Sequence, residues 1–368
     1  MYLCNLQNDT VCTQLVFKLN TNNHRLPFLP SELVVDILLR LPARSLIQFR
    51  RVCKLWKTLI SDPNFAKKHF LMSAADPSLT HQRLAFCDCS YPLNSLLENP
   101  STRVIPDRFN GFENDRCFLV GSCNGFLCIY DPYQNNMIMY NPSIGLKSKS
   151  SPKLKPSAHW GMPYNGFGYD HVNDKYKVLA VVEHDVRDIN NEDFDLPYIH
   201  STYAVGKYVS GTLNWVAHKL TQYVIISFDL DKETYRDVLL PPTIRDCNDY
   251  MCKPSLCVLN DRLCLCFVNK THWVVWSMKE YGVVESWTKL IKIPRDKLIF
   301  LNSIDPYSFI ELLFISENGV VLLMVFCPSF SQLFLYNLNS GVLDHPFISI
   351  DRLCVYDLHI YRENLISP

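Results

Sequence analysis

The sequence predicts an α+β chain of two domains, a short helical N-terminal domain followed by an all-β, propeller-like domain. Apolar residues recur with helical spacing between residues 26 and 72, whereas short β runs separated by turn residues fill the chain from residue 84 onward. Hairpin units recur about every 45 to 55 residues, which is the period of propeller blades. This period predicts about five to six blades, one of them incomplete.

The changes in pattern divide the chain into four segments. Residues 1–25 form an N-terminal extension, residues 26–72 the helical domain, residues 73–83 a linker and residues 84–368 the propeller-like domain. A helical block of about 45 residues has too few apolar groups to close a core alone. We therefore expect a partner surface to complete it.

The helical domain begins with an apolar stripe. Leu33, Ile37 and Leu41 repeat every four residues, which places them on one face of a helix. Pro42 ends this helix because proline lacks the N–H group of a helix interior and clashes with the preceding turn. The further helical segments are residues 43–50, residues 52–61 and, as a short helix or an extended segment, residues 64–71.

The β domain is indicated by repeated hairpins. The strongest signal is Asn124-Gly125 between two apolar runs, because both central residues of a type I′ turn need a positive φ. Similar units recur as KYVSGTLNWVA, CVLNDRLCLCFV and ISENGVVLLMVF, and the strands that follow the units lie in MIMYNPSIG, YVIISFDLDKET, HWVVWSMKEYG and LFLYNLNSG. The tryptophans that we expect inside the blades are Trp215, Trp273, Trp276 and Trp287.

Composition and charge restrict the classes of partner. The chain has 36 Lys and Arg against 36 Asp and Glu, and this zero net charge disfavours nucleic acid as the main ligand. The longest apolar run, Val320–Cys327, is far shorter than the roughly 20 residues that cross a bilayer, so no membrane partner is expected. The N-terminus lacks the basic start and continuous apolar stretch of a secretory signal.

The cysteines indicate a reduced compartment. Their number, fifteen, is odd, and two Cys-x-Cys pairs lie in strand-like segments, which favours buried thiols in a cytoplasmic or nuclear protein. Cys247, Cys252 and Cys257 lack the spacing of a zinc site, and no pair of histidines accompanies them. Neither a metal nor another cofactor is therefore expected.

On these residues the chain resembles a known family, the plant F-box proteins with an F-box-associated, kelch-like domain. The F-box resemblance covers residues 26–71 and rests on Leu29-Pro30, Leu33, Ile37-Leu38, Leu41-Pro42, Ser45-Leu46, Phe49, Val52-Cys53, Trp56 and Ile60-Ser61-Asp62-Pro63. The second resemblance covers most of residues 119–341, through GSCNGFLCIYDP, MYNPS, GFGYDHVNDKYKVLAV, VSGTLNWVA, IISFDLDKETYRDVLLP and VWSMKEYGVVESWTKL in that order.

The resemblance implies a substrate receptor of a Skp/cullin/F-box ubiquitin ligase, without catalytic residues of its own. In this family the F-box packs against a Skp-type adaptor, which links it to a cullin and a RING subunit, and the propeller holds a protein target. The sequence does not name that target. The adaptor-binding residues that the resemblance implies are Leu29, Pro30, Leu33, Ile37, Leu38, Leu41, Pro42, Leu46, Val52, Cys53 and Trp56.

Other interpretations of these features stay open. The apolar stripe and Trp56 could belong to an ordinary core, and the lysine-rich residues 145–157 could carry a nuclear signal or a phosphorylation site rather than form only a solvated loop. A lectin-like propeller is the main alternative, in which exposed Trp160, Tyr164 and Tyr169 would stack on a sugar. Catalysis is not expected, since the chain has no G-x-S-x-G motif and no P-loop.

The chain departs from the family between residues 184 and 200. Members of the family usually have a strand pair here, whereas this interval is rich in Asp, Glu and Asn and has no strand alternation. We therefore expect one short blade with an unpaired edge beside the LAVV segment. With such a blade the chain could be a truncated receptor, which binds the adaptor without presenting a target well.

Overall fold

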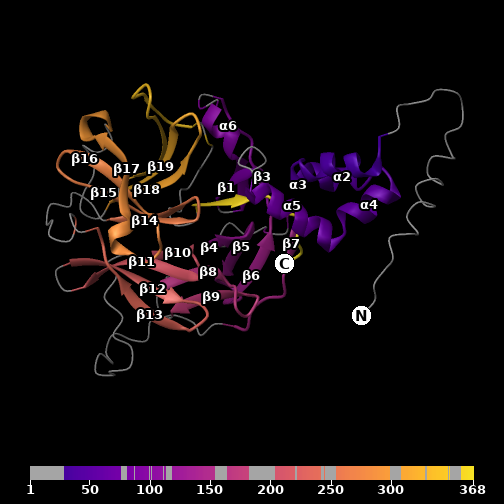
Figure 1. Cartoon of the computed structure of the whole chain (residues 1–368), viewed down its shortest axis with the longest axis horizontal. Helices are drawn as coiled ribbons and strands as arrows, with labels where there is room; N and C mark the ends of the chain where they lie inside the picture. The colour runs from indigo at the N-terminus through magenta and orange to yellow at the C-terminus, as the bar shows by residue number, and fades with distance from the viewer. Residues whose placement is uncertain are drawn as a thin grey trace, which may run out of the picture.

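The computed structural model of the protein describes residues 29–368 with several internal exceptions. These exceptions are residues 76–80, 87, 99, 101, 111, 113–117, 154–163, 182–203, 220–221, 242–243, 245–253, 299–307, 328–329, 347 and 349–357. Figure 1 shows a small module of helices, α2 to α5, beside a larger body of β-sheets. The two-domain α+β architecture predicted from the sequence is confirmed.

Four helices form the N-terminal module. They are α2 (Ser31–Leu39), α3 (Ala43–Phe49), α4 (Lys54–Ile60) and α5 (Pro63–Ala75). The carboxylate of Asp62 accepts the N–H groups of Asn64 at 2.7 Å and Phe65 at 3.1 Å, and in this way begins α5. The fourth segment is therefore a helix rather than an extended segment, and it continues to Ala75, past the expected limit at residue 72.

Within the described residues, the β domain is a propeller of five sheets, four of which have four strands. The first sheet contains β22 (Leu358–Arg362), β1 (Gln82–Phe86), β2 (Cys89–Pro92) and β3 (Asp107–Arg108), and the second β4 (Phe118–Cys123), β5 (Phe126–Asp131), β6 (Asn136–Asn141) and β7 (Leu146–Lys147). The fourth contains β14 (Ser255–Leu259), β15 (Arg262–Val268), β16 (His272–Met278) and β17 (Trp287–Pro294), and the fifth β18 (Phe309–Ile315), β19 (Val320–Cys327), β20 (Phe330–Asn337) and β21 (Leu343–Asp344). Helix α6 (Leu93–Glu98) follows β2, and the short helical turns are η5 (Val284–Ser286) and η6 (Arg295–Lys297).

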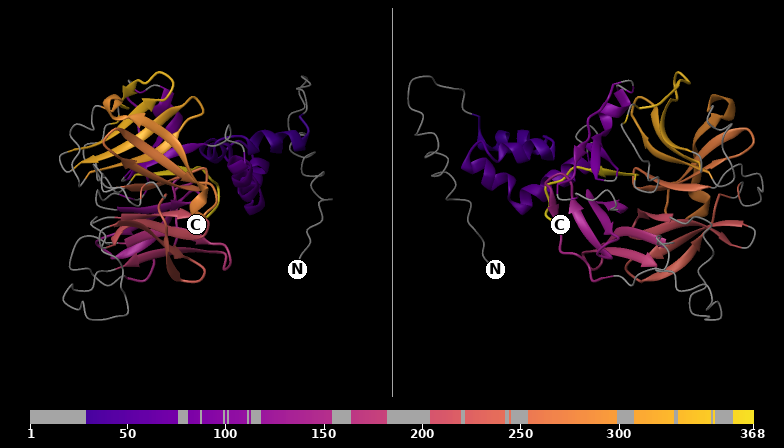
Figure 2. Two further views of the ribbon diagram at one scale, coloured as in Figure 1. Left: turned by 60° about the vertical axis from the view of Figure 1, so that its left-hand side comes forward. Right: turned by 180° about the vertical axis from the view of Figure 1, so that it is seen from behind.

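The first sheet closes the propeller. Its strand β22 comes from the C-terminal end of the chain and pairs antiparallel with β1, from Gln82 opposite Arg362 to Phe86 opposite Leu358. In Figure 2 the yellow C-terminal segment reaches the side of the propeller that faces the indigo helical module. The position of the helical module is thus tied to the point where the two ends of the propeller join.

The hairpins expected from the sequence are confirmed. Asn124-Gly125 joins β4 to β5 with φ values of 50° and 80°, as a type I′ turn requires. Two further turns have positive φ at both central residues, Ser210-Gly211 at 50° and 77° and Asn260-Asp261 at 49° and 56°. Local turn chemistry therefore sets the register of these hairpins.

The third sheet has six strands in the order β13-β12-β11-β10-β8-β9. They are β8 (Tyr164–Asp170), β9 (Lys175–Val181), β10 (Ala204–Val209), β11 (Thr212–Lys219), β12 (Gln222–Asp229) and β13 (Thr234–Val238). The β8–β9 hairpin, expected as part of a separate short blade, instead shares a sheet with the next blade through a parallel seam between residues 164–166 and 204–206. The interval 184–200 lies outside the described residues, and within the described chain β9 ends this sheet.

Two glycines allow the parallel seam to form under a tryptophan ring. The indole N–H of Trp215 donates to the carbonyl oxygen of Asn165 at 3.1 Å. A Cβ atom on Gly206 would lie 2.6 Å from that indole ring, and one on Gly166 would lie 3.3 Å from it. The seam therefore depends on glycine where the two strands pass beneath Trp215.

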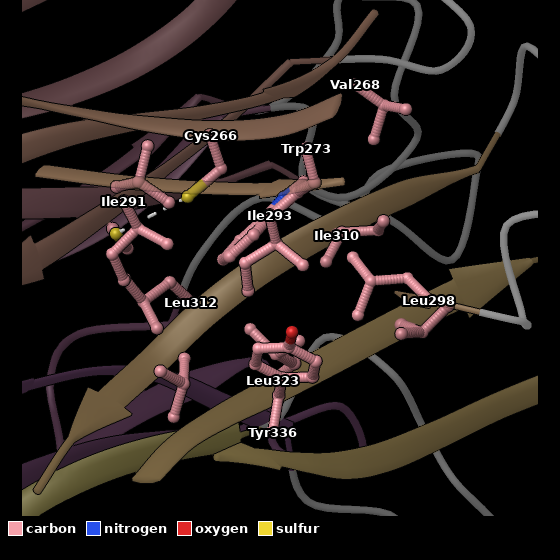
Figure 3. Packing of buried hydrophobic residues seen from close by; sticks show 14 of the residues in the cluster. Cys266, Val268, Trp273, Ile291, Ile293, Leu298, Ile310, Leu312, Leu323 and Tyr336 are labelled. Carbon is pink, nitrogen blue, oxygen red and sulfur yellow. Dashed lines mark hydrogen bonds between the residues drawn. The ribbon is translucent and has the colours of Figure 1, made fainter. Parts of the chain in front are cut away.

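The blades pack through large apolar side chains. Figure 3 shows Trp273 among aliphatic side chains that include Ile293 and Leu323, in a cluster shared by the fourth and fifth sheets. The tryptophans predicted to lie inside the blades are all buried: Trp215 is 3% exposed, Trp273 0%, Trp276 8% and Trp287 6%. Their assignment to blade packing is confirmed.

The first prediction concerns the parallel seam. Gly206→Ala should lower the free energy of unfolding by about 1–3 kcal/mol, because its methyl group would overlap the Trp215 ring. Chemical denaturation followed by tryptophan fluorescence measures this change. Thr234→Ala, at an exposed position of β13 in the same sheet, is the control and should change stability by less than about 0.5 kcal/mol. Equal stability of the two variants would contradict the proposed role of the glycine.

Candidate functional site

The helical module exposes a set of large apolar side chains, which is unusual for a water-soluble surface. Leu33 and Ile37, each 49% exposed, are four residues apart and lie along one side of α2, and Leu29, just before the helix, is 54% exposed. Val52, which is 61% exposed, lies just before α4, and Leu55 within α4 is 42% exposed. Five aliphatic groups on so small a module provide apolar area that a partner could bury.

Two of the predicted site residues lie below this surface. Leu38 is 1% exposed and Leu46 is 0% exposed, and both belong to the core of the module together with Ile60 and Phe65. Their side chains cannot touch a partner while the module is folded. They hold α2 and α3 in place beneath the exposed groups.

The remaining predicted residues at the start of α2 and α4 have local structural roles. Pro30 is exposed and its carbonyl oxygen accepts the N–H of Val34 at 3.2 Å, in the first turn of α2. The Cys53 sulfur accepts the N–H of Trp56 at 3.4 Å and caps α4. Trp56 is half-buried, with its ring centroid 5.6 Å from that of Phe49. Part of the Trp56 ring therefore packs inside the module and part reaches solvent.

Leu41 and Pro42 lie between α2 and α3, and only Pro42 faces the propeller. The carbonyl oxygen of Leu41 accepts a hydrogen bond of 2.8 Å from Nε2 of His69, and burial lowers the pKa of this histidine. Pro42 lines a cavity of about 250 Å³ between the module and the first sheet, where it faces Arg83 and Glu363 among others. These two residues are therefore placed differently from Leu33 and Ile37, with which the sequence pattern grouped them.

An ion-pair cluster joins the module to the propeller. Arg44 of α3 lies 2.6 Å from the carboxylate of Asp107 in β3 and 3.6 Å from that of Glu363. Arg83 of β1 pairs with the same two carboxylates. Glu363 and Arg83 are 4% and 6% exposed, so these two charges are shielded from water and need a partner, whereas the side chains of Arg44 and Asp107 are 29% and 45% exposed.

The described residues contain no group of three or more His, Cys, Asp and Glu side chains that could hold a metal ion. No described helix is both long enough and apolar enough to span a bilayer. Of the aromatic residues considered for sugar binding, Tyr169 packs against His171 and Tyr176, with ring centroids 4.9 Å away in each case. Trp160 and the side chain of Tyr164 lie outside the described residues.

Sequence reasoning missed three features of the helical module, of which Leu71 lies outside the candidate site. Leu55 is exposed three residues after Val52, and this spacing in the sequence could have indicated that both belong to the exposed set. Arg44 connects the module to the propeller, but a single arginine in a short helix gives no signal of a distant carboxylate. Leu71 of α5 is 58% exposed and was not assigned, because α5 has no clear apolar stripe.

The fold and its surface define a class of two-domain proteins, in which a small helical module with exposed apolar side chains is attached to a β-propeller. Residues 26–68 match the F-box domain, and residues 80–356 match the F-box associated beta propeller domain. The chain therefore belongs to the family of F-box proteins with an F-box-associated propeller.

Relatives from Arabidopsis thaliana agree with this assignment. The chain is 31% identical to F-box/kelch-repeat protein At3g23880 over 92% of this chain and 96% of the other. It is 26% identical to F-box protein CPR1 over 79% of this chain and 78% of the other. The first similarity, at 92% of this chain, extends through both the helical module and the propeller.

The second prediction separates the buried from the exposed residues of the F-box. Leu46→Ala should destabilise the F-box core by about 2–5 kcal/mol, because it leaves a cavity at a fully buried position. Ile37→Ala, at an exposed position, should cost less than about 0.5 kcal/mol. Hydrogen exchange of the backbone amides in α2 to α5 measures both changes. Similar protection in the two variants would contradict this division.

Proposed function

We propose that this chain is the substrate receptor of a Skp/cullin/F-box ubiquitin ligase. The observation that carries the proposal is the exposed apolar set on an F-box, namely Leu29, Leu33, Ile37, Val52 and Leu55. A protein–protein interface gains most of its free energy from such apolar anchors at its centre. A Skp-type adaptor that covers these residues would connect the chain to a cullin and a RING subunit.

The predicted adaptor-binding residues divide into three groups in this proposal. The exposed residues, together with the outer part of Trp56, contact the adaptor. Leu38 and Leu46 support them from the core, and Cys53 begins α4. Leu41 bonds to His69 of α5 within the F-box, and Pro42 lies at the border with the propeller.

The propeller has the role of holding a protein target. Ubiquitin transfer occurs in the other subunits of such a ligase, so the receptor acts by placing a target lysine near the reactive thioester. A bound target has a high effective concentration at that thioester when the receptor has a defined geometry. The chain therefore needs two binding surfaces and a stable connection between them, and no catalytic side chain of its own.

The third prediction tests the adaptor surface. The double variant Ile37→Ala/Val52→Ala should bind a recombinant Skp-type adaptor roughly 10- to 100-fold more weakly, because two exposed aliphatic anchors are lost. Isothermal titration calorimetry with the full chain measures the affinity. Leu71→Ala is the matched control, since Leu71 is 58% exposed on α5 but lies outside the proposed surface.

Two results would count against the adaptor surface. The first is an unchanged affinity in the double variant, and the second is an equal loss of affinity in Leu71→Ala.

Affinity purification of the wild-type chain with the proteasome inhibited should in addition recover the adaptor, the cullin and the target. The target identified in this way supplies the substrate for ubiquitination assays.

We also propose that the protein acts in the cytoplasm or the nucleus, with its thiols reduced. The described cysteines are free, and most of them are buried. Burial raises the pKa of Cys89 to about 11 and that of Cys128 to about 12, so these thiols are protonated and unreactive at neutral pH.

The fourth prediction concerns these thiols. Titration of unfolded protein that was purified without reductant should detect nearly all fifteen cysteines as free thiols. In the folded protein the six buried cysteines among the described residues should react slowly with the same reagent, because the reagent cannot reach them. Several disulfides that survive unfolding would argue for an oxidising compartment instead.

A further inference from the structure

The chain segment after β22, residues 363–366, runs between the F-box and the propeller. In Figures 1 and 2 the C-terminal end of the chain lies at the border between the helices and the sheets. Each of these four residues has a contact on one or both sides of this border. We name residues 363–366 the C-terminal clamp.

The propeller holds the clamp through Asn364, which is 0% exposed. Its side-chain N–H group donates to the carbonyl oxygen of Asn124 at 2.9 Å, and its side-chain oxygen accepts from Nδ2 of Asn141 at 2.6 Å. Its backbone N–H donates to the hydroxyl of Ser143 at 3.1 Å. Nδ2 of Asn141 also donates to the carbonyl oxygen of Ile366 at 2.7 Å. The second sheet therefore binds both ends of the Asn364–Ile366 stretch.

These contacts explain two short motifs of the propeller sequence. In MYNPS, Asn141 and Ser143 are the residues that bind the clamp. In the Asn124-Gly125 turn, a Cβ atom on Gly125 would lie 2.2 Å from Nδ2 of Asn364 and 2.4 Å from the carbonyl oxygen of Arg362. Gly125 thus has a second role besides its positive φ, because it leaves room for the clamp.

The F-box holds the other side of the clamp. Leu365 is 5% exposed and belongs to the same core cluster as Leu38, Leu46 and Ile60. Ile366 packs against this cluster and also against the cluster between the second and third sheets. The F-box core is therefore completed in part by residues that the propeller holds in place.

Charge pairing adds a directional contact to this apolar one. Glu363 faces Arg44 of the F-box and Arg83 of the propeller, each at 3.6 Å, and its carboxylate also accepts the backbone N–H of Arg44 at 3.4 Å. A buried carboxylate between two arginines from different domains favours a single arrangement of those domains, because a rotation of the F-box would separate Arg44 from both of its carboxylate partners.

We propose that the C-terminal clamp sets the orientation of the F-box relative to the propeller, with Glu363, Asn364 and Leu365 as positioning residues. The orientation itself does not depend on the proposed function. Only its consequence does, namely that a target on the propeller is held in one direction relative to the adaptor. Loss of the clamp would leave each domain folded and the adaptor surface intact. The orientation between the domains would then no longer be unique.

The experiment compares two glycine variants of the full chain. Gly125→Ala places a methyl group where the clamp passes, whereas Gly211→Ala introduces the same kind of backbone strain, at φ of 77°, with no atom within 4 Å of the added Cβ. Fluorescent labels on azide-bearing amino acids at Lys67 of α5 and Lys175 of β9, both exposed, report the distance between the domains. Single-molecule energy transfer gives the distribution of that distance.

We expect a single narrow distribution for the wild type and for Gly211→Ala, and a broadened or shifted one for Gly125→Ala. A second variant, Glu363→Gln/Leu365→Ala, removes the F-box contacts of Glu363 and Leu365 but keeps Asn364 and Ile366, and it should broaden the distribution in the same way. Its control is Asp88→Asn/Leu343→Ala, which makes the same chemical changes at an exposed ion pair and in the fifth sheet, away from the F-box. This control should resemble the wild type.

Adaptor affinity, measured on the same proteins, separates the inference from the proposed function. Unchanged affinity with a broadened distribution supports the clamp as an orienting device. Narrow distributions in both clamp variants, or lost adaptor binding in Gly125→Ala, would overturn it, because the clamp would then be dispensable or needed for the F-box fold itself. A wild-type chain without adaptor affinity would overturn the proposed function, while the distance distributions would still test the clamp.

Discussion

The pairing of β22 with β1 is the constraint on which the rest of the structure depends. Gln82 lies opposite Arg362, so the first sheet cannot be completed until almost the whole propeller has been synthesised and brought together. The same strand leads directly into Glu363 and Asn364, which meet the F-box and the second sheet. One continuous chain segment therefore first closes the propeller and then contacts the F-box.

This arrangement changes how the F-box core should be understood. The sequence suggested that so short a helical block needs a partner to bury its apolar groups, and the structure shows that the chain itself supplies part of that surface. Leu365, Ile366 and Ile144 of the propeller side pack against the F-box cluster. The exposed groups of α2 and α4 remain on the module after this contact is made. An F-box attached on one side and open on another has room for one external partner.

The parts of the fold that the sequence predicted correctly are those that depend on neighbouring residues. A type I′ turn at Asn124-Gly125 needs only those two residues to adopt positive φ, so its hairpin could be recognised from a few letters. The parallel seam between β8 and β10 depends instead on Trp215 reaching Asn165, and the clamp depends on Asn141 reaching Asn364. No local pattern encodes contacts across 50 or more than 200 residues, so these features emerged only from the structure.

Helix α2 shows why the sequence alone could not define the candidate site either. Its sequence, SELVVDILL, is apolar on two faces, because Leu33 and Ile37 lie outward while Leu38 and Leu39 are buried. Helical periodicity identifies the faces but cannot say which of them the chain itself covers. A helix that packs only against the core of its own domain needs one apolar face, and a polar opposite face makes it more soluble. The second apolar face of α2 is thus a feature that folding alone does not require, and this is the physical reason to connect it with a partner.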